Sequence, residues 1–427
     1  MKYIISLLII IFSFSNTYAQ KIKAKTVLAT ALNDKRLQLN TQTTTFAQGL
    51  RYHLPIIKQV EARIGINGSS LGDSLFGSIR NEDVYGLNIS TNSFKEIRLQ
   101  KLVKQAQIEA LASENRVFEQ AALLERYQTL SAFYFSQKLI LEKQKLDSLI
   151  GKKHDILRVM VEQGQDIKVK DVMDTEGDKN TVQLALMDLE NTMRTKRALL
   201  SLFLASDNSA DIDFSDFIVP SKIQEIINDH SRVSNHPVIE FRNARSNLTA
   251  SKLNYISAQN RQVFNSLRLG YQDPIFLEER KKFNPLNNFS IRVGLVVPLP
   301  GNNNYRRSDA LLELREAQDA VTLSQDNYKR AVDLQNIKLS NLMVQYDLTK
   351  ATIEQSLINK MLGNKKLLSQ ITPLEIADLT IAQQKIKVRT LEIEIEITNE
   401  YLKYLDFTGI LSQKPLKNYL SMGLDSF

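Results

Sequence analysis

The side chains that most often carry out catalysis or bind metal ions are few in this chain. The sequence has no cysteine. It has four histidines, none at the i, i+4 spacing that lets two helical imidazoles share one ion: His53, His154, His230 and His236. We find no glycine-rich phosphate loop, no nucleophile elbow, and no carboxylate pair beyond those expected on helix surfaces. The sequence therefore predicts a protein that is not an enzyme, with no catalytic, cofactor-binding or metal-binding residues.

The charged side chains are spread along the chain and do not form clusters. The net charge is +8, and such a spread is typical of solvated surfaces and argues against nucleic acid as a partner. Three arginines differ from the rest because each lies in a short segment of alternating polarity: Arg63, Arg268 and Arg292. A guanidinium stays charged at any relevant pH and binds anions, so the role of these three depends on the elements that position them.

The first nineteen residues predict a signal peptide. Lys2 is followed by an apolar run from Tyr3 to Phe14 and then by the small-residue region Thr17-Tyr18-Ala19. The mature chain is expected to begin at Gln20. A membrane anchor is the competing interpretation, but about twelve apolar residues fall short of the roughly twenty that a spanning helix needs. No later run is long enough either, so an exported chain of this kind enters a bilayer only as strands.

A run from Phe94 to Gln163 is the longest regular segment. It contains no proline and one glycine, Gly151, and an unbroken helix of this length reaches on the order of 100 Å. Its apolar residues recur at intervals of seven and four, as expected for a coiled-coil helix packed along its neighbours: Leu139, Leu146, Ile150, Leu157 and Val161. A solvated single helix or a filament rod is the alternative on this stretch alone.

The segments around this helix predict a first repeat over residues 20–206. Residues 20–34 are polar and suggest a flexible start, and residues 35–53 suggest a short helix. Side chains then alternate over about 60–68 and 83–91, which predicts two strands, followed by a long helical hairpin over 94–206. Residues 207–236 form the expected linker.

The same order recurs over residues 237–408. Strands are predicted over about 263–273 and 288–298, and a second long helical hairpin over 306–408, followed by a tail at 409–427. The two helix turns, at Gly164 and Ser369, lie 205 residues apart, and two strand glycines, Gly86 and Gly294, lie 208 apart. The chain is therefore expected to be an internal duplication.

Four strands with one apolar face predict part of a transmembrane barrel. The residues expected to face lipid are Ile64, Leu87, Leu269, Ile291, Val293 and Leu295. Four strands cannot close, and an open edge in lipid leaves backbone groups unpaired, so we expect a homotrimer with a 12-stranded barrel continued by a helical tube. The alternation then places Arg63, Arg268 and Arg292 in the lumen, where they would favour anions; the alternative is that each pairs with a neighbouring carboxylate.

Several short segments carry a resemblance to a known family. They are Val293-Gly-Leu-Val-Val-Pro-Leu-Pro-Gly301 with Arg306-Arg307, His236-Pro237 followed by Ala244, Ala250 and Ala258, and the turn from Val161 to Asp174. In order and spacing the chain resembles the TolC-like outer-membrane efflux and secretion channels. It departs from them in lacking the Pro-Leu-Pro-Gly segment in its first repeat and in having Ser369 where glycine is frequent. The resemblance implies a mainly α fold with a transmembrane β part, located in the outer membrane with a periplasmic extension, and a passive duct joined to a periplasmic adaptor and an inner-membrane pump of RND or ABC type.

Both helix turns are expected at one end of the tube, because both hairpins leave the barrel in the same direction. Eight residues at or near the turns are candidates for a gate: Gly164, Asp166, Asp171, Lys365, Lys366, Ser369, Glu375 and Asp378. A solvated helix end is the alternative interpretation of these charges. For the whole protein, the rival hypothesis is a periplasmic coiled-coil adaptor, which would have long helical hairpins but no need for four strands with an apolar face.

Overall fold

The computed structural model describes residues 22–50, 55–64, 85–205, 212–229, 236–259, 264–271, 289–295, 304–364 and 370–427. The predicted signal peptide and the loop ends of the predicted strands lie outside these ranges. The elements in chain order are β1 (Ile22–Lys23), α2 (Ala24–Ala29), the 3₁₀ helix η1 (Thr30–Asn33), α3 (Lys35–Gly49), β2 (Ile57–Ile64), β3 (Tyr85–Thr91), α4 (Phe94–Glu162), α5 (Val169–Leu204), β4 (Ile212–Asp213), α6 (Pro220–Asp229), α7 (Pro237–Gln259), β5 (Phe264–Tyr271), β6 (Phe289–Leu295), α8 (Asn304–Gln355), α9 (Leu357–Gly363), α11 (Pro373–Thr408) and the 3₁₀ helix η4 (Ile410–Ser412).

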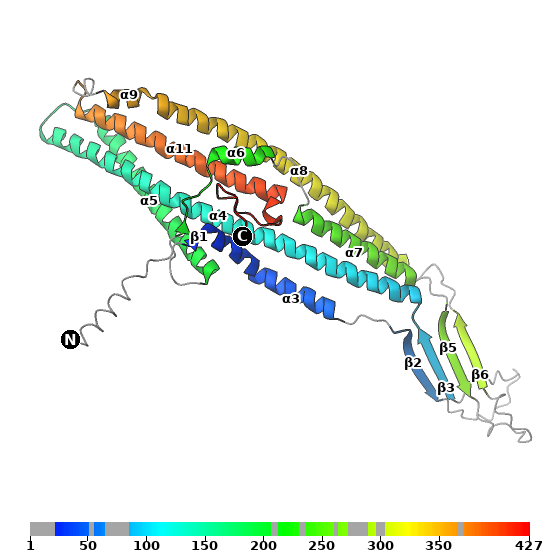
Figure 1. Ribbon diagram of the computed structural model, residues 1–427. Coiled ribbons are helices and arrows are strands. Elements are labelled where there is room, and N and C mark those ends of the chain that lie inside the picture. The colour runs from blue at the N-terminus through cyan, green and yellow to red at the C-terminus, as the bar shows by residue number, and fades with distance from the viewer. Residues whose placement is uncertain are drawn as a thin grey trace, which may run out of the picture. The chain divides into compact units, whose positions relative to one another are not determined.

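The described chain divides into two compact units, each built from separate stretches of sequence. Unit 1 takes its described residues from Met1–Leu39, Asn115–Pro237 and Gln325–Phe427. Unit 2 takes them from Asn40–Glu114 and Val238–Ser324 and contains the main sheet (Figure 1). The long helices α4 and α8 each contribute residues to both units.

The helix α4 is 69 residues long, as the proline-free run predicts. Its start is capped by Ser93, whose N–H donates to Glu96 Oε2 (3.0 Å) and whose Oγ accepts from the Lys95 N–H (3.3 Å). The side chain of Glu96 is buried at this helix start. None of the described helices has an apolar stretch long enough to cross a bilayer.

The second long helix, expected to run from about residue 306 to the turn at Ser369, is interrupted. α8 ends at Gln355, and Ser356 has extended backbone torsions (φ −55°, ψ 126°). The Ile358 N–H donates to Ser356 Oγ (3.1 Å), so the serine starts the short helix α9. The interruption arises because a serine side chain can hydrogen-bond the backbone locally in place of a helical carbonyl.

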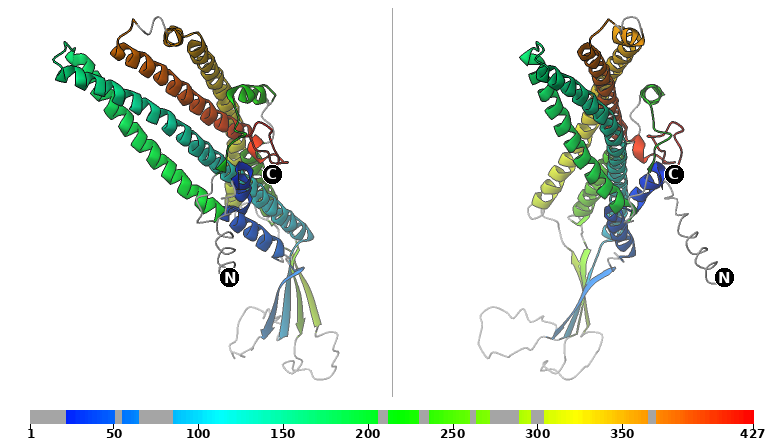
Figure 2. Two further views of the ribbon diagram at one scale, coloured as in Figure 1. Left: turned by 60° about the vertical axis from the view of Figure 1, so that its left-hand side comes forward. Right: turned by 90° about the vertical axis from the view of Figure 1, so that its left-hand side faces the viewer.

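The main sheet has four antiparallel strands in the order β2-β3-β5-β6. Figures 1 and 2 show these strands side by side, so that the two strands of each sequence repeat form a hairpin and the hairpins meet at β3 and β5. β2 and β6 are the two edge strands. The strands begin or end within a few residues of the predicted bounds.

The first described residues and the C-terminal tail are both packed into unit 1. β1 pairs in parallel with β4. Val27 and Leu28 are completely buried, so the expectation of a flexible start at residues 20–34 was wrong for the described part of it. The tail is held by Tyr127 of α4, whose hydroxyl donates to the Lys417 carbonyl and accepts from the Tyr419 N–H.

Candidate functional site: sheet faces and helix turns

The strand register separates the side chains of the sheet into an apolar and a polar face. On the apolar face, Leu87 lies opposite Leu269, and Leu269 lies opposite Ile291. Ile64 shares this face by its register position, although its side chain lies outside the described residues. Ile291, Val293 and Leu295 of β6 are 72%, 55% and 66% exposed. The predicted lipid-facing residues thus share one face of the sheet.

The polar face carries the three predicted arginines. One row across the sheet runs from Glu61 through Asn88 and Arg268 to Arg292. Arg63 lies one row further on the same face, and its guanidinium is 3.2 Å from Glu61. The alternative of a carboxylate partner therefore holds for Arg63. Arg268 and Arg292 lie directly opposite each other, an arrangement that is unfavourable for like charges unless something compensates it.

The turn between α4 and α5 is a Schellman motif. The Gly164 N–H donates to the Val161 carbonyl and the Gln165 N–H donates to the Met160 carbonyl, both at 3.0 Å. Gly164 has a φ of +68°, which glycine adopts without strain. Of the other residues predicted here, Asp166 is exposed in the turn and Asp171 lies in the first turn of α5.

At the other predicted turn, α11 begins with a capping box. The Thr372 N–H and hydroxyl donate to Glu375 Oε2 (2.9 and 2.8 Å), and these bonds lower the pKa of Glu375. Asp378 lies 2.7 Å from Lys153 of α4. Lys365, Lys366 and Ser369 lie outside the described residues. Within unit 1, the α4–α5 turn and the start of α11 lie at the same end in both views of Figure 2.

Three further polar links join the first helical hairpin to α11 within unit 1. Lys385 of α11 is 2.7 Å from Asp178 of α5, and Glu392 of α11 is 3.3 Å from Lys143 of α4. Gln384 donates to the Glu142 carbonyl (3.0 Å) and carboxylate (2.8 Å). Sequence reasoning missed Lys153, Asp178 and Lys385, because partners more than 200 residues apart leave no local signal.

Comparisons with known proteins give structural matches only. No known family model matches the chain, and no curated protein matches it in sequence. Among solved structures, the outer membrane protein VceC of Vibrio cholerae matches over 90% of this chain and 96% of its own, at 12% identity and a TM-score of 0.59. The CmeC outer membrane channel of Campylobacter jejuni matches over 90% and 85%, at 12% identity and 0.61. The MtrE outer membrane channel of Neisseria gonorrhoeae matches over 91% and 89%, at 12% identity and 0.58.

This chain has the TolC-like channel fold.

In this TolC-like fold, the start of the second repeat is anchored to the end of α11. The His236 ring lies 3.0 Å from the Asp406 carbonyl and contacts the Tyr328 ring, with centroids 3.8 Å apart and planes tilted by 31°. Gln120 of α4 donates to the Asp406 carbonyl (2.8 Å) and carboxylate (2.7 Å). Burial lowers the pKa of His236 to about 4 and raises the pKa of Asp406. His236-Pro237, one of the segments behind the resemblance, thus has a structural role here.

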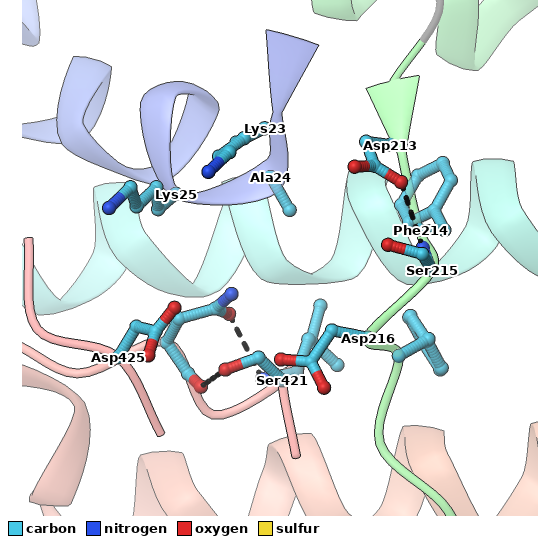
Figure 3. Close-up of a pocket in the computed structure, with 12 residues that line it drawn as sticks. Lys23, Ala24, Lys25, Asp213, Phe214, Ser215, Asp216, Ser421 and Asp425 are labelled. Atoms are coloured by element: carbon cyan, nitrogen blue, oxygen red, sulfur yellow. Dashed lines mark hydrogen bonds between the residues drawn. The ribbon is translucent and has the colours of Figure 1, made fainter. Parts of the chain in front are cut away.

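One small pocket in unit 1 lies beside β1, β4 and the tail (Figure 3). Its volume is about 160 Å³, and its charged lining residues are Lys23, Lys25, Asp213, Asp216 and Asp425. Ligand sites usually measure about 300–1,000 Å³, so we assign no ligand to it. In the part of the chain that the structure describes, no group of three or more His, Asp or Glu side chains is placed to hold a metal ion.

Proposed function

We propose that the protein is the outer-membrane channel of a tripartite efflux or type I secretion system, a passive trimeric duct from the periplasm to the exterior. The observation that carries this proposal is the four-stranded sheet with one exposed apolar face, present in a chain whose long helices and strands match TolC-like channels over about nine-tenths of its length. A sheet face of this kind is costly in water and stable against lipid.

The edges of the sheet support a trimer. β2 and β6 each have one side without a partner strand in the described chain, and unpaired backbone groups in hydrocarbon cost several kcal/mol each. Pairing β6 of one copy with β2 of the next removes every open edge when the ring closes. Three copies give twelve strands, a number for which side chains leave room for water in the lumen.

The helical part is assigned to the periplasm, where it would meet a membrane-fusion adaptor and an inner-membrane pump of RND or ABC type. The chain itself offers no recognised nucleotide-binding loop, so the pump would provide the energy and select the cargo. The residues at the helix turns would form the closed mouth, and the adaptor would shift the population toward an open one.

The rival function is that of a periplasmic coiled-coil adaptor. It would use the same helical hairpins, but a soluble adaptor gains nothing from a sheet whose β6 exposes Ile291, Val293 and Leu295. The two functions differ in where the protein is found and in what it does to a bilayer.

The test is to express the full chain, separate the membranes and reconstitute the purified protein in planar bilayers. A channel is expected in the outer-membrane fraction as a trimer that dissociates on heating and gives discrete conductance steps. A monomer or dimer in the soluble periplasmic fraction, with no conductance, would overturn the proposal in favour of the adaptor.

A further inference from the structure

The row of residues at the loop end of the sheet is largely aromatic, whereas the rows next to it are not. Tyr85 of β3 lies opposite Tyr271 of β5, and Tyr271 lies opposite Phe289 of β6. The rings of Tyr271 and Phe289 are in edge contact, with centroids 5.5 Å apart and planes at 61°. Three consecutive strands therefore place an aromatic residue in the same row.

This aromatic row shares its face with aliphatic rows. The neighbouring row consists of Ala62, Leu87, Leu269 and Ile291, and the next one of Val60, Ile89, Leu267 and Val293. None of the side chains in these two rows is aromatic. Along β3, β5 and β6, the face changes from aliphatic to aromatic at the end next to residues 65–84 or 272–288, whereas β2 has Ile64 in this row.

The aromatic side chains of this row are available to a partner. Tyr85 is 50% exposed and Phe289 is 61% exposed. A tyrosine ring has an apolar body and a polar hydroxyl, and it is most stable where hydrocarbon meets lipid headgroups. Aliphatic side chains have no such preference for the boundary and are most stable within the hydrocarbon.

We infer that Tyr85, Tyr271 and Phe289 form the aromatic girdle of the barrel, bound at the boundary between acyl chains and headgroups of the outer leaflet. The inference rests on the proposed function, because it needs the apolar face to contact lipid. The girdle fixes the depth of the barrel: the three residues mark the outer interface, and the aliphatic rows lie toward the bilayer centre. The leaflet follows from the chain order, since the opposite strand ends lead into α4 and α8.

Because the chain contains no tryptophan, the fluorescence of a single introduced tryptophan reports the depth of that residue in the bilayer. Single substitutions Tyr271→Trp and Phe289→Trp place one indole in the girdle, and Val293→Trp places one four residues along β6 from Phe289. At about 3.4 Å per residue and a tilt of about 40°, those four residues correspond to roughly 10 Å of depth. Leu184→Trp, at an exposed position of α5, is the control away from lipid.

Each trimer is reconstituted in phosphatidylcholine vesicles brominated either near the headgroup end or near the methyl end of the acyl chain. We expect Tyr271→Trp and Phe289→Trp to lose more fluorescence to the shallow bromines, Val293→Trp to lose more to the deep bromines, and Leu184→Trp to lose none. If the indoles at 271 and 289 prefer the deep bromines as strongly as the one at 293, the aromatic row is only a cross-strand packing feature and the girdle is wrong. If no position on the sheet is quenched, the proposed channel itself fails.

Discussion

The protonation of His236 is tied to the folded state. Its folded pKa of about 4 lies below the ordinary value of 6.5 because the ring is buried. As pH falls from about 6.5 to about 4, the unfolded chain takes up this proton and the folded chain does not, so the free energy of unfolding falls over that window. Asp406 acts in the opposite direction, because its raised pKa favours the folded state in acid.

We therefore expect His236→Gln to reduce the loss of stability on acidification. The variant keeps a donor that can reach the Asp406 carbonyl but removes the titrating ring. The measurement is the thermal unfolding midpoint of the detergent-solubilised protein at pH 7.5 and pH 5. His154→Gln, at a partly exposed position of α4, is the matched control and should decline like the parent. An unchanged decline in His236→Gln would show that other groups cause it.

Gly409 gives a second prediction at the same junction. It has a φ of +71°, and a Cβ there would lie 3.0 Å from His236 Cα and 3.1 Å from Pro237 Cδ. Gly409→Ala should destabilise the protein by about 1–3 kcal/mol, because it adds left-handed strain and crowding. Gly151→Ala, within α4 and with no atom within 4 Å of its added Cβ, should stabilise by about 0.5–1 kcal/mol. Denaturant unfolding measures both, and a neutral Gly409→Ala would contradict the close contact.

At the level of single residues, the sequence identified His236-Pro237 as part of a resemblance. It did not predict which residues His236-Pro237 contacts. Its partners Asp406 and Gly409 lie about 170 residues away, and such pairs are brought together only by the whole fold. The contacts of Glu375, in contrast, are local. It was predicted as a gate residue by its position, and Thr372-x-x-Glu375 is also a capping pattern visible in the sequence.

Among the elements, the strands give the most specific prediction. Val293→Arg places a guanidinium on the apolar face of β6 and should block stable insertion, at about 2–4 kcal/mol per chain near the midplane. Ser290→Arg adds the same side chain to the opposite face, where Arg292 already lies, and should leave the outer-membrane trimer intact. Heat-modifiable migration of the trimer in outer-membrane fractions reports both. A Val293→Arg trimer at parental abundance would show that the assigned lipid face is wrong.

The ion pairs between the hairpins predict how the helix turns are held. Lys385→Asp removes the link to Asp178 and adds repulsion between α5 and α11, so the mouth should open and single-channel conductance should rise. An exposed pair contributes only about 0–1 kcal/mol, so the trimer should persist. The double variant Asp178→Lys with Lys385→Asp restores the pair and should restore the low conductance.

Arg158→Ala is the control for this experiment, since Arg158 pairs only within α4 among its described ion pairs, with Asp155 and Glu162. It should not change the conductance. If Lys385→Asp conducts like the parent while remaining trimeric, the link between α5 and α11 does not hold the mouth closed.

The elements were predictable where one period extended over many residues. The proline-free run gave α4, and alternation at a period of two gave the sheet strands. The order of the start at residues 22–33 was missed because so short a segment gives no clear periodic signal, and Val27 and Leu28 are buried in a core formed with distant parts of the chain. Ser356 interrupts the second long helix without any proline or glycine to indicate it.

At the scale of the whole molecule, the duplication in sequence determined most of what could be expected. Two helix-hairpin repeats with matching turns and strands limited the architecture to one sheet and two helical hairpins. The division into two units that each combine both repeats could not be predicted, because it depends on which parts of α4 and α8 pack with which neighbours.

The charge of the polar face determines the last prediction, which concerns ion selectivity. Within the described strands of the sheet, this face carries three arginines and one glutamate, so each chain would contribute two net positive charges to the lumen of a trimer. Glu61 is 3.2 Å from Arg63, so the carboxylate offsets one of the three positive charges locally. Cationic groups lining a narrow duct raise the local concentration of anions and exclude cations.

Reversal potentials in a salt gradient should therefore show anion preference in the parent channel. The preference should be lost in Arg268→Gln with Arg292→Gln, which lowers the net charge of this face from +2 to 0 per chain, and should weaken by less in Arg63→Gln, which lowers it to +1. Arg315→Gln, whose guanidinium lies 3.3 Å from Asp319 within α8, is the control and should leave selectivity unchanged. Raising the salt concentration should reduce the preference, since the Debye length falls from about 10 Å at 0.1 M to about 3 Å at 1 M. Cation preference in the parent would mean that the arginine face does not line the duct.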